Sequence, residues 1–347
     1  MEIFTGKNIT KGKTIRDVRI EGASVEVDLA MSYPCASMHA QLAVDLEQLI
    51  TALDGVKQAK VNVDTHIIAH SVQHGVKRME NIKNIIAVAS GKGGVGKSTT
   101  SVNLALALAH EGATVGLLDA DIYGPSQPRM MGLSGQPESS DGKSIEPMYN
   151  YGIATMSIGY LIDEETPMIW RGPMVTQALE QMLNDTNWGE LDYLVIDLPP
   201  GTGDTQLTLA QKVPVSGAII VTTPQDIALL DARKGLKMFE KVEVPILGIV
   251  ENMSTHVCSQ CGHEESIFGS GGGARMAEDY DVTLLGSLPL DMSIREQADG
   301  GKPTVVNGPD SAVSQRYREI ARKASAALAN QAKDYSASFP NIVIQST

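Results

Sequence analysis

The chain has 347 residues, of which 42% are apolar and 20% charged, and its formal net charge is −13. This length predicts two domains, or one large domain with an appendage. The low aromatic content (four Phe, two Trp) and the negative charge argue against a surface that stacks bases or binds a nucleic-acid backbone, but not against a small anion site. The three cysteines and the lack of an 18-residue apolar run or export signal lead us to expect a cytoplasmic protein without a membrane span or disulfide framework.

Residues 1–70 predict a small α+β domain. Residues 24–31 and 59–68 alternate in polarity as strands do, and residues 36–53 carry leucine and isoleucine at helical spacing. The polar stretch 71–83 is expected to be a linker to a second domain, residues 84–333, which a tail, residues 334–347, follows.

From Asn84 onward, short apolar runs alternate with helical patterns. The runs occupy residues 85–90, 113–121, 151–159, 191–200, 217–224, 245–253 and 284–290. Apolar runs separated by helices predict an α/β fold with a mostly parallel sheet covered by helices on both faces. Residues 314–333 predict the final helix.

The sequence GKGGVGKST, residues 91–99, lies between the first of these runs and a helical pattern. Gly91, Gly96, Lys97 and Ser98 satisfy the phosphate-loop motif G-x-x-x-x-G-K-[ST] in its required strand–loop–helix context. The glycines let consecutive N–H groups point at one anion, and the helix N-terminus adds partial positive charge. We expect Lys97 to reach the β- and γ-phosphates and the Ser98 hydroxyl to bind Mg²⁺. The other predicted nucleotide-binding residues of this loop are Lys92, Gly93, Gly94, Val95 and Thr99.

Carboxylates stand at the ends of two predicted strands. Asp197 follows four apolar residues, a Walker-B pattern, and is expected to hold the Mg²⁺ shell. Asp119 and Asp121 end the run 113–121, where ligands of open α/β sheets lie. A strand-end aspartate also serves as a helix N-cap, and for Asp119 this alternative stays open. The sequence PPGTGD after Asp197 is typical of a switch segment. No N-K-x-D guanine motif occurs, so ATP is favoured over GTP.

Two cysteines, Cys258 and Cys261, form a C-x-x-C pair beyond another strand end, flanked by His256 and His263. A thioredoxin-like redox pair would open a helix, which this stretch does not favour. A zinc site made from all four residues lacks the usual spacing, so we interpret the histidines as ordinary loop residues. Four thiolates from two chains would suit either zinc or a [4Fe–4S] cluster. The cysteine pair alone leaves both metals open.

The loop GKGGVGKS, with Lys92 directly after its first glycine, resembles the deviant phosphate loop of the MinD-like NTPases. The resemblance implies that Lys92 crosses a dimer interface and contacts the partner's nucleotide, as an arginine finger does. It also implies that Asp121 positions or activates the attacking water, that Asp119 sits near the metal, and that Asn252 contacts adenine.

Further motifs in the same order, LLDADIYGPS, IWRGPMV, YLVIDLPPGTGD and ENMS before C-x-x-C, resemble the Mrp/ApbC family of iron–sulfur cluster carrier ATPases over residues 82–330. This resemblance implies a homodimeric ATPase, using ATP and Mg²⁺, that binds a [4Fe–4S] cluster through Cys258 and Cys261 of both chains. Its partners would be assembly scaffolds and apo-proteins that receive the cluster.

Residues 14–68 resemble the MIP18-type assembly domain found in some members of that family. The D-P-E-type turn that usually opens this domain is missing from residues 1–13. Cys35 lies near the domain's family cysteine. A structural thiol and a transient contact with the cluster are both open interpretations of Cys35.

Two rival classes share the phosphate loop. The main alternative is a MinD- or partition-type positioning ATPase with a structural zinc ion bridging the dimer. Such a protein needs a membrane or DNA surface, whereas residues 314–333 lack an apolar face with a basic rim. The other rival is a nitrogenase-type iron protein, whose cluster cysteines lie far apart in sequence, unlike this pair. We therefore expect no nucleic-acid and no membrane partner.

Overall fold

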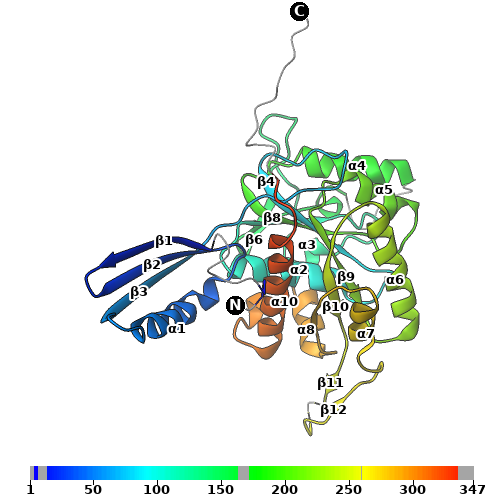
Figure 1. The fold of residues 1–347 in the computed structure, drawn as a ribbon. Helices are drawn as coiled ribbons and strands as arrows, with labels where there is room; N and C mark the ends of the chain where they lie inside the picture. Colours follow the sequence, from blue (N-terminus) through cyan, green and yellow to red (C-terminus); the bar gives the residue numbers. More distant parts are fainter. Residues whose placement is uncertain (1–3, 7–13, 163–171, 259, 335–347) are drawn as a thin grey trace, which may run out of the picture.

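The structure, a computed structural model, describes residues 4–6, 14–162, 172–258 and 260–334. A large central sheet is flanked by helices on both faces, and a small sheet with one helix projects from one side (Figure 1). The predicted α/β class with an additional N-terminal α+β unit is confirmed. Among the described residues, no helix is both long enough and apolar enough to cross a bilayer.

The large sheet has eight strands, and each predicted apolar run of the second domain overlaps one of them, although β4 begins at Ile82, before its run and within the predicted linker. Their order is β13 (Leu284–Ser287), β10 (Ile246–Glu251), β9 (Gly217–Thr222), β4 (Ile82–Ala89), β8 (Leu191–Asp197), β5 (Val115–Asp119), β7 (Ile153–Ser157) and β6 (Met148–Asn150). All neighbours are parallel except β6 and β7. The three-residue edge strand β6 was not predicted, because so short a segment carries no periodicity.

Apart from the partly exposed edge strands β6 and β13, the strands are largely buried on both faces, as their continuous apolar runs predict. On β4, Ile85 and Ala87 face one core cluster while Ile86 and Val88 face the other, because successive side chains alternate across a sheet. One face is covered by α2 (Lys97–His110) and α10 (Ala312–Ala329), which the short helices α8 (Met292–Asp299) and α9 (Thr304–Asn307) precede. The other face is covered by α4 (Gly172–Asn184), α5 (Asp204–Lys212), α6 (Asp226–Lys241) and α7 (Gly272–Asp279).

The parallel arrangement brings the predicted site residues to one edge of the sheet. Asp197 pairs in register with Asp119 on one side and with Val88 on the other. The phosphate loop follows β4 directly and α2 begins at Lys97. Because the carboxyl ends of parallel strands meet at the same edge, residues far apart in the chain become neighbours there.

The N-terminal unit contains β1 (Ile15–Glu21), β2 (Ser24–Met31), β3 (Gln58–Thr65) and α1 (His39–Thr51). The hairpin of β1 and β2 is antiparallel, and β3 joins β2 in parallel after the crossover through α1. Strand β1 was not predicted; its charged residues lie on an exposed face where Arg19 pairs with Asp28 at 2.7 Å.

A buried seam joins this unit to the large domain. Met31, Tyr33 and Cys35 pack against Ala326 of α10, so the structure places Cys35 out of contact with water. Beside them, the fully buried Glu111 ends α2, where a negative charge opposes the helix dipole.

Hydrogen-bond donors surround the Glu111 carboxylate in this seam. It accepts bonds from the N–H (3.1 Å) and hydroxyl (2.8 Å) of Ser37, within the 3₁₀ turn Ala36–Met38, and from the Arg322 guanidinium of α10 (2.5 Å). These bonds hold the N-terminal unit, the phosphate-loop helix and the final helix together.

Two predicted segments lie wholly or partly outside the described residues. Of the tail, residues 334–347, only Asp334 is described, and it pairs with Arg78 at 2.8 Å. The first part of the IWRGPMV motif, residues 169–171, is likewise not described.

We expect Arg322→Ala to lower the free energy of unfolding by about 3 kcal/mol, because Glu111 would stay buried without its cation. Urea-induced unfolding measures this change. The control is Lys323→Ala, which removes a more exposed ion pair with Glu319 and should cost less than about 1 kcal/mol. Equal losses in the two variants would contradict the structural role of this cluster.

Candidate functional site

Glycine is required at several points of the phosphate loop. Gly94 and Gly96 adopt φ of 81° and 82°, in the left-handed region that favours glycine. A Cβ on Gly91 would lie 2.1 Å from the carbonyl carbon of Asp231, where α6 packs against the loop. A Cβ on Gly96 would lie 2.2 Å from the side-chain nitrogen of Asn252. The loop is therefore confined by α6 on one side and by the residue after β10 on the other.

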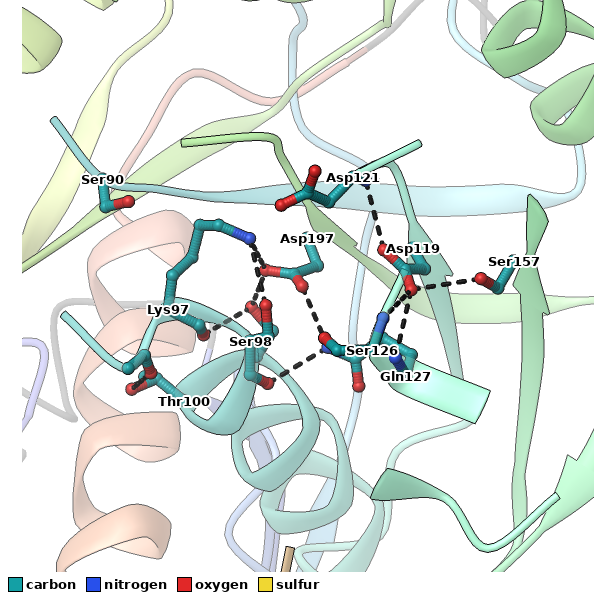
Figure 2. Close-up of polar contacts among 12 residues, drawn as sticks. Ser90, Lys97, Ser98, Thr100, Asp119, Asp121, Ser126, Gln127, Ser157 and Asp197 are labelled. Carbon is teal, nitrogen blue, oxygen red and sulfur yellow. Dashed lines mark hydrogen bonds and ion pairs between the residues drawn. The ribbon is translucent and has the colours of Figure 1, made fainter. Parts of the chain in front are cut away.

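Lys97 and Asp197 form a buried ion pair at the centre of the site (Figure 2). The Lys97 Nζ lies 2.6 Å from Asp197 Oδ1 and 3.2 Å from the Ser98 hydroxyl. Ser101, one helical turn further along α2, donates to the same carboxylate oxygen at 2.8 Å. A bound phosphate would attract the same ammonium, so phosphate and Asp197 compete for Lys97.

Asp119 holds the loop that follows β5. One carboxylate oxygen accepts the Asp121 N–H at 3.1 Å, and the other accepts the N–H groups of Ser126 and Gln127 and the Ser157 hydroxyl at 3.0 to 3.1 Å. These contacts cap the short helix α3 (Gln127–Met130). Burial, and then repulsion by Asp197, raise the pKa of Asp119 to about 7. The two open interpretations of Asp119 were a helix cap and a position near magnesium. These hydrogen bonds are those of a helix cap, and the position near magnesium stays a prediction.

Asp121 belongs to the same cluster and lies beside Asp197 (Figure 2). Partial burial raises the pKa of Asp121, while the Lys97 ammonium opposes that rise. Its predicted role with the attacking water stays a prediction.

The donor set around Lys97 fits a magnesium ion bound together with a nucleotide. Ser98 and Asp197 supply a hydroxyl and a carboxylate, the oxygen ligands that Mg²⁺ takes beside phosphates and water. The buried Ser126 Oγ and Gln127 Oε1 have no hydrogen-bond partner within the described part of the chain. Unpaired buried oxygens beside a carboxylate are consistent with a hydrated cation that pairs with them when bound.

Two further predicted nucleotide contacts flank the loop. No hydrogen bond or ion pair engages the Lys92 ammonium within the described ranges, although the Ser90 hydroxyl donates to the Lys92 carbonyl at 2.9 Å. Asn252 donates its side-chain N–H to the Val95 carbonyl at 2.9 Å and so supports the loop directly. Contact of Asn252 with adenine stays a prediction.

The predicted switch segment contacts the phosphate loop. Gly201, with φ of 108°, donates its N–H to the Ser90 carbonyl at 2.9 Å, and the Gln206 side chain holds the Pro200 carbonyl at 2.8 Å. The segment thus lies directly between the phosphate loop and α5.

The C-x-x-C pair occupies a small hairpin that projects from the core (Figure 1), formed by β11 (His256–Val257) and β12 (Glu264–Glu265). The Cys258 N–H donates to the His263 carbonyl at 2.9 Å, and the Gly262 N–H donates to the Cys258 carbonyl at 2.9 Å. Cys258 is half-buried and Cys261 is exposed. No helix begins at the described residues on either side of position 259, so they do not show the geometry of a thioredoxin-like pair.

The thiols have the surroundings of metal ligands. The N–H groups of Cys261 and Gln260 donate to the Cys258 sulfur and lower the pKa of Cys258, which favours the thiolate that binds metals. The His256 ring nitrogen Nδ1 is engaged by the Leu290 carbonyl at 3.0 Å, and His263 is exposed. Within the described ranges, no three His, Cys, Asp or Glu side chains are placed to hold one metal ion. The hairpin of one chain therefore offers two cysteine side chains to a metal.

Three residues whose side chains contact the central carboxylates were missed by sequence reasoning: Ser101, Gln127 and Ser157. The i+4 spacing from Lys97 places Ser101 on the inner face of α2, so that signal was present. Gln127 and Ser157 carry no such signal, because their positions follow from the fold of the loop and from β7.

Comparison with known proteins gives two family matches. Residues 81–325 match the family described as NUBPL iron-transfer P-loop NTPase, and residues 4–63 match the family described as iron-sulfur cluster assembly protein. The iron-sulfur cluster carrier protein of Pseudomonas fragi is 59% identical over 80% of this chain and 97% of its own length. The protein of the same name from Escherichia coli is 52% identical over 92% and 87%. A mouse iron-sulfur cluster transfer protein is 54% identical over 71% and 77%.

Two solved structures are also similar to this chain. A nucleotide-binding protein of Archaeoglobus fulgidus, in complex with ADP, superposes with a TM-score of 0.60 and 38% identity over 69% of this chain and 93% of that one. The cell division ATPase MinD of Pyrococcus furiosus superposes with a TM-score of 0.52 over 69% and 97%, at 24% identity, and so shares the fold.

We expect alkylation of Cys258 by iodoacetamide to reach half its maximal rate at a pH below the value of about 8.5 of an ordinary thiol. The lowered pKa gives more thiolate at each pH between the two values. Peptide mass spectrometry after timed labelling measures the rate. Cys261→Ser keeps the donating N–H and should keep the low midpoint, whereas a midpoint at or above about 8.5 in both proteins would contradict this account.

Proposed function

Because this chain belongs to the iron–sulfur cluster carrier family of P-loop NTPases, we propose that it holds a [4Fe–4S] cluster between two copies of itself and passes it to apo-proteins. The observation that carries the proposal is the projecting hairpin, which presents one half-buried and one exposed thiol beside an NTPase core. A cluster that must be handed over needs thiolates that a recipient can reach.

The need for two copies follows from the number of thiols. A [4Fe–4S] cluster normally takes four thiolates, and this chain has three cysteines. Cys35 is buried against α10, so it cannot join Cys258 and Cys261 on the hairpin without opening the seam. A second copy supplies the missing pair. Zinc remains the rival metal for the same four thiolates.

The surface around the phosphate loop supports the same dimer. At the start of α6, Ile227 and Leu230 are 70% and 55% exposed, and this helix touches the loop at Gly91. On and after the hairpin, Val257 and Ile267 are each 51% exposed. Burial of these apolar side chains against a second copy would stabilise a dimer. Lys92 would then reach the partner's nucleotide.

In the proposed ATPase cycle, Lys97 binds the β- and γ-phosphates, Ser98 and Asp197 hold Mg²⁺, and Asp121 orients the attacking water. Bound Mg²⁺ would neutralise phosphate charge. Asn252, already against the loop, is the proposed adenine contact. The switch segment would respond to loss of the γ-phosphate.

The positioning-ATPase alternative is not favoured by the family matches. The final helix also argues against it, because Tyr317, Ile320 and Leu328 on its apolar face are buried in the core. That helix therefore has no free apolar face for a membrane.

The proposed partners are a second copy, scaffolds that supply the cluster, and apo-proteins that accept it. The proposed compartment is a reducing cytoplasm, which keeps thiols such as those of Cys258 and Cys261 reduced.

Anaerobic reconstitution with iron and sulfide tests the cluster directly. We expect about four iron atoms per wild-type dimer, with visible charge-transfer absorbance, and a loss of most of this iron in Cys258→Ala/Cys261→Ala. Cys35→Ala is the matched control and should keep its iron. An unchanged iron content in the double variant would exclude the hairpin site, and binding of zinc without iron would favour the rival metal.

Lys92→Ala tests the proposed dimer contact. We expect it to bind ATP within a few-fold of wild type, because Lys97 remains, but to lose ATP-dependent dimerisation and to slow hydrolysis by about 10³-fold. Analytical ultracentrifugation with ATP measures the association, and Lys83→Ala, at the far end of β4, is the control. ATP-dependent dimers and normal hydrolysis in Lys92→Ala would refute the contact.

A further inference from the structure

Gln127 occupies a central place in the nucleotide site. It is the first residue of α3 and is only 1% exposed. Its side-chain Nε2 donates to Asp197 Oδ2 at 3.0 Å and to the Ser98 carbonyl at 3.1 Å (Figure 2). One amide group thus connects the loop after β5 to the end of β8 and to the first turn of α2.

The bond to Asp197 fixes the orientation of that carboxylate. Lys97 and Ser101 share Oδ1, whereas Gln127 is the side chain that donates to Oδ2. When Lys97 turns to a phosphate, the carboxylate loses its cation and keeps the two neutral donors. The Gln127 amide then remains as a donor to Oδ2. A carboxylate free to rotate would bind a cation less well, because its oxygens would not be held in place.

The other half of the amide is unpaired. Gln127 Oε1 is buried and has no hydrogen-bond partner within the described ranges, and the same is true of the neighbouring Ser126 Oγ. Leaving a buried acceptor unpaired carries a desolvation cost. A partner absent from the chain itself accounts for that cost, and a water of a hydrated Mg²⁺ ion is such a partner, since Mg²⁺ keeps several of its waters in nucleotide sites.

We infer that Gln127 is a positioning residue for the magnesium–nucleotide site, acting through its amide N–H on Asp197 and through its free Oε1. The inference rests on the proposed nucleotide site and deepens it. Asp119 supports the arrangement, because it accepts the Gln127 backbone N–H at 3.1 Å and so fixes the start of α3. A side chain of the size of glutamine without the amide would keep the packing. It would lose both the N–H that donates to Asp197 and the free Oε1.

The test compares wild type with Gln127→Met and Gln127→Asn. Methionine keeps the length and lacks the amide; asparagine keeps the amide on a shorter side chain. Gln297→Met is the matched control, because Gln297 Oε1 is also buried and unpartnered but lies on α8, outside the site. ADP affinity is measured by calorimetry in EDTA and across a Mg²⁺ titration, and thermal unfolding is measured without nucleotide.

We expect both Gln127 variants to need about tenfold more Mg²⁺ for half of the gain in ADP affinity, because the carboxylate that holds the ion is no longer oriented. ADP affinity in EDTA should change less than about threefold, and Gln297→Met should match wild type. A purely structural role would lower the unfolding temperature and leave the Mg²⁺ midpoint unchanged, which would overturn the inference. If Gln127→Met does not fold, Gln127→Asn decides alone. Absence of Mg²⁺-dependent ADP binding in wild type would refute the nucleotide site itself as well.

Discussion

Lys97 and Asp197 carry opposite charges in a place that water hardly reaches, with side-chain exposures of 5% and 0%. Either charge alone would be unfavourable there, because an unpaired buried ion costs several kcal/mol. The neighbouring residues of the site support this ion pair. Ser101 and Gln127 complete the hydrogen bonds of the carboxylate, and Asp119, adjacent on β5, organises the loop that delivers Gln127. A nucleotide offers Lys97 a second anionic partner, so ligand binding and the internal ion pair draw on the same cation.

Much of this arrangement was predictable because it depends on local patterns. The strand runs, the phosphate loop and the strand-end aspartates all follow from residue order, and a parallel sheet brings strand ends together without further information. A cap by Asp119 was one open interpretation, but which N–H groups it accepts, and the position of the Gln127 amide, were not predictable, since they depend on how the loop between residues 120 and 127 turns back on β5. The edge strand β6 and the two-residue strands of the hairpin were missed for another reason: segments of two or three residues have no periodicity to detect.

The N-terminal unit and the large domain also have separate cores. Both large core clusters are built almost entirely from residues after Ile82, and the N-terminal unit contributes Ile67 alone to them. The unit is attached instead through its own seam at Met31, Tyr33 and Cys35 and through the Glu111 cluster. This explains how a chain can carry two family signatures with separate cores. It also explains why Cys35, although it lies in the assembly-type unit, serves packing in this conformation.

Asn252 has one consequence for the hairpin. It bonds the Val95 carbonyl of the phosphate loop and stands six residues before Cys258 in the chain. Hydrogen bonds hold the intervening backbone in place. The Ser254 N–H donates to the Leu288 carbonyl at 2.9 Å, and the Leu290 N–H donates to the Thr255 carbonyl at 2.7 Å. A six-residue segment spans at most about 20 Å. The phosphate loop and the first cysteine of the hairpin are thus connected by a short segment of chain. A displacement of the loop is therefore transmitted to Cys258 through few residues.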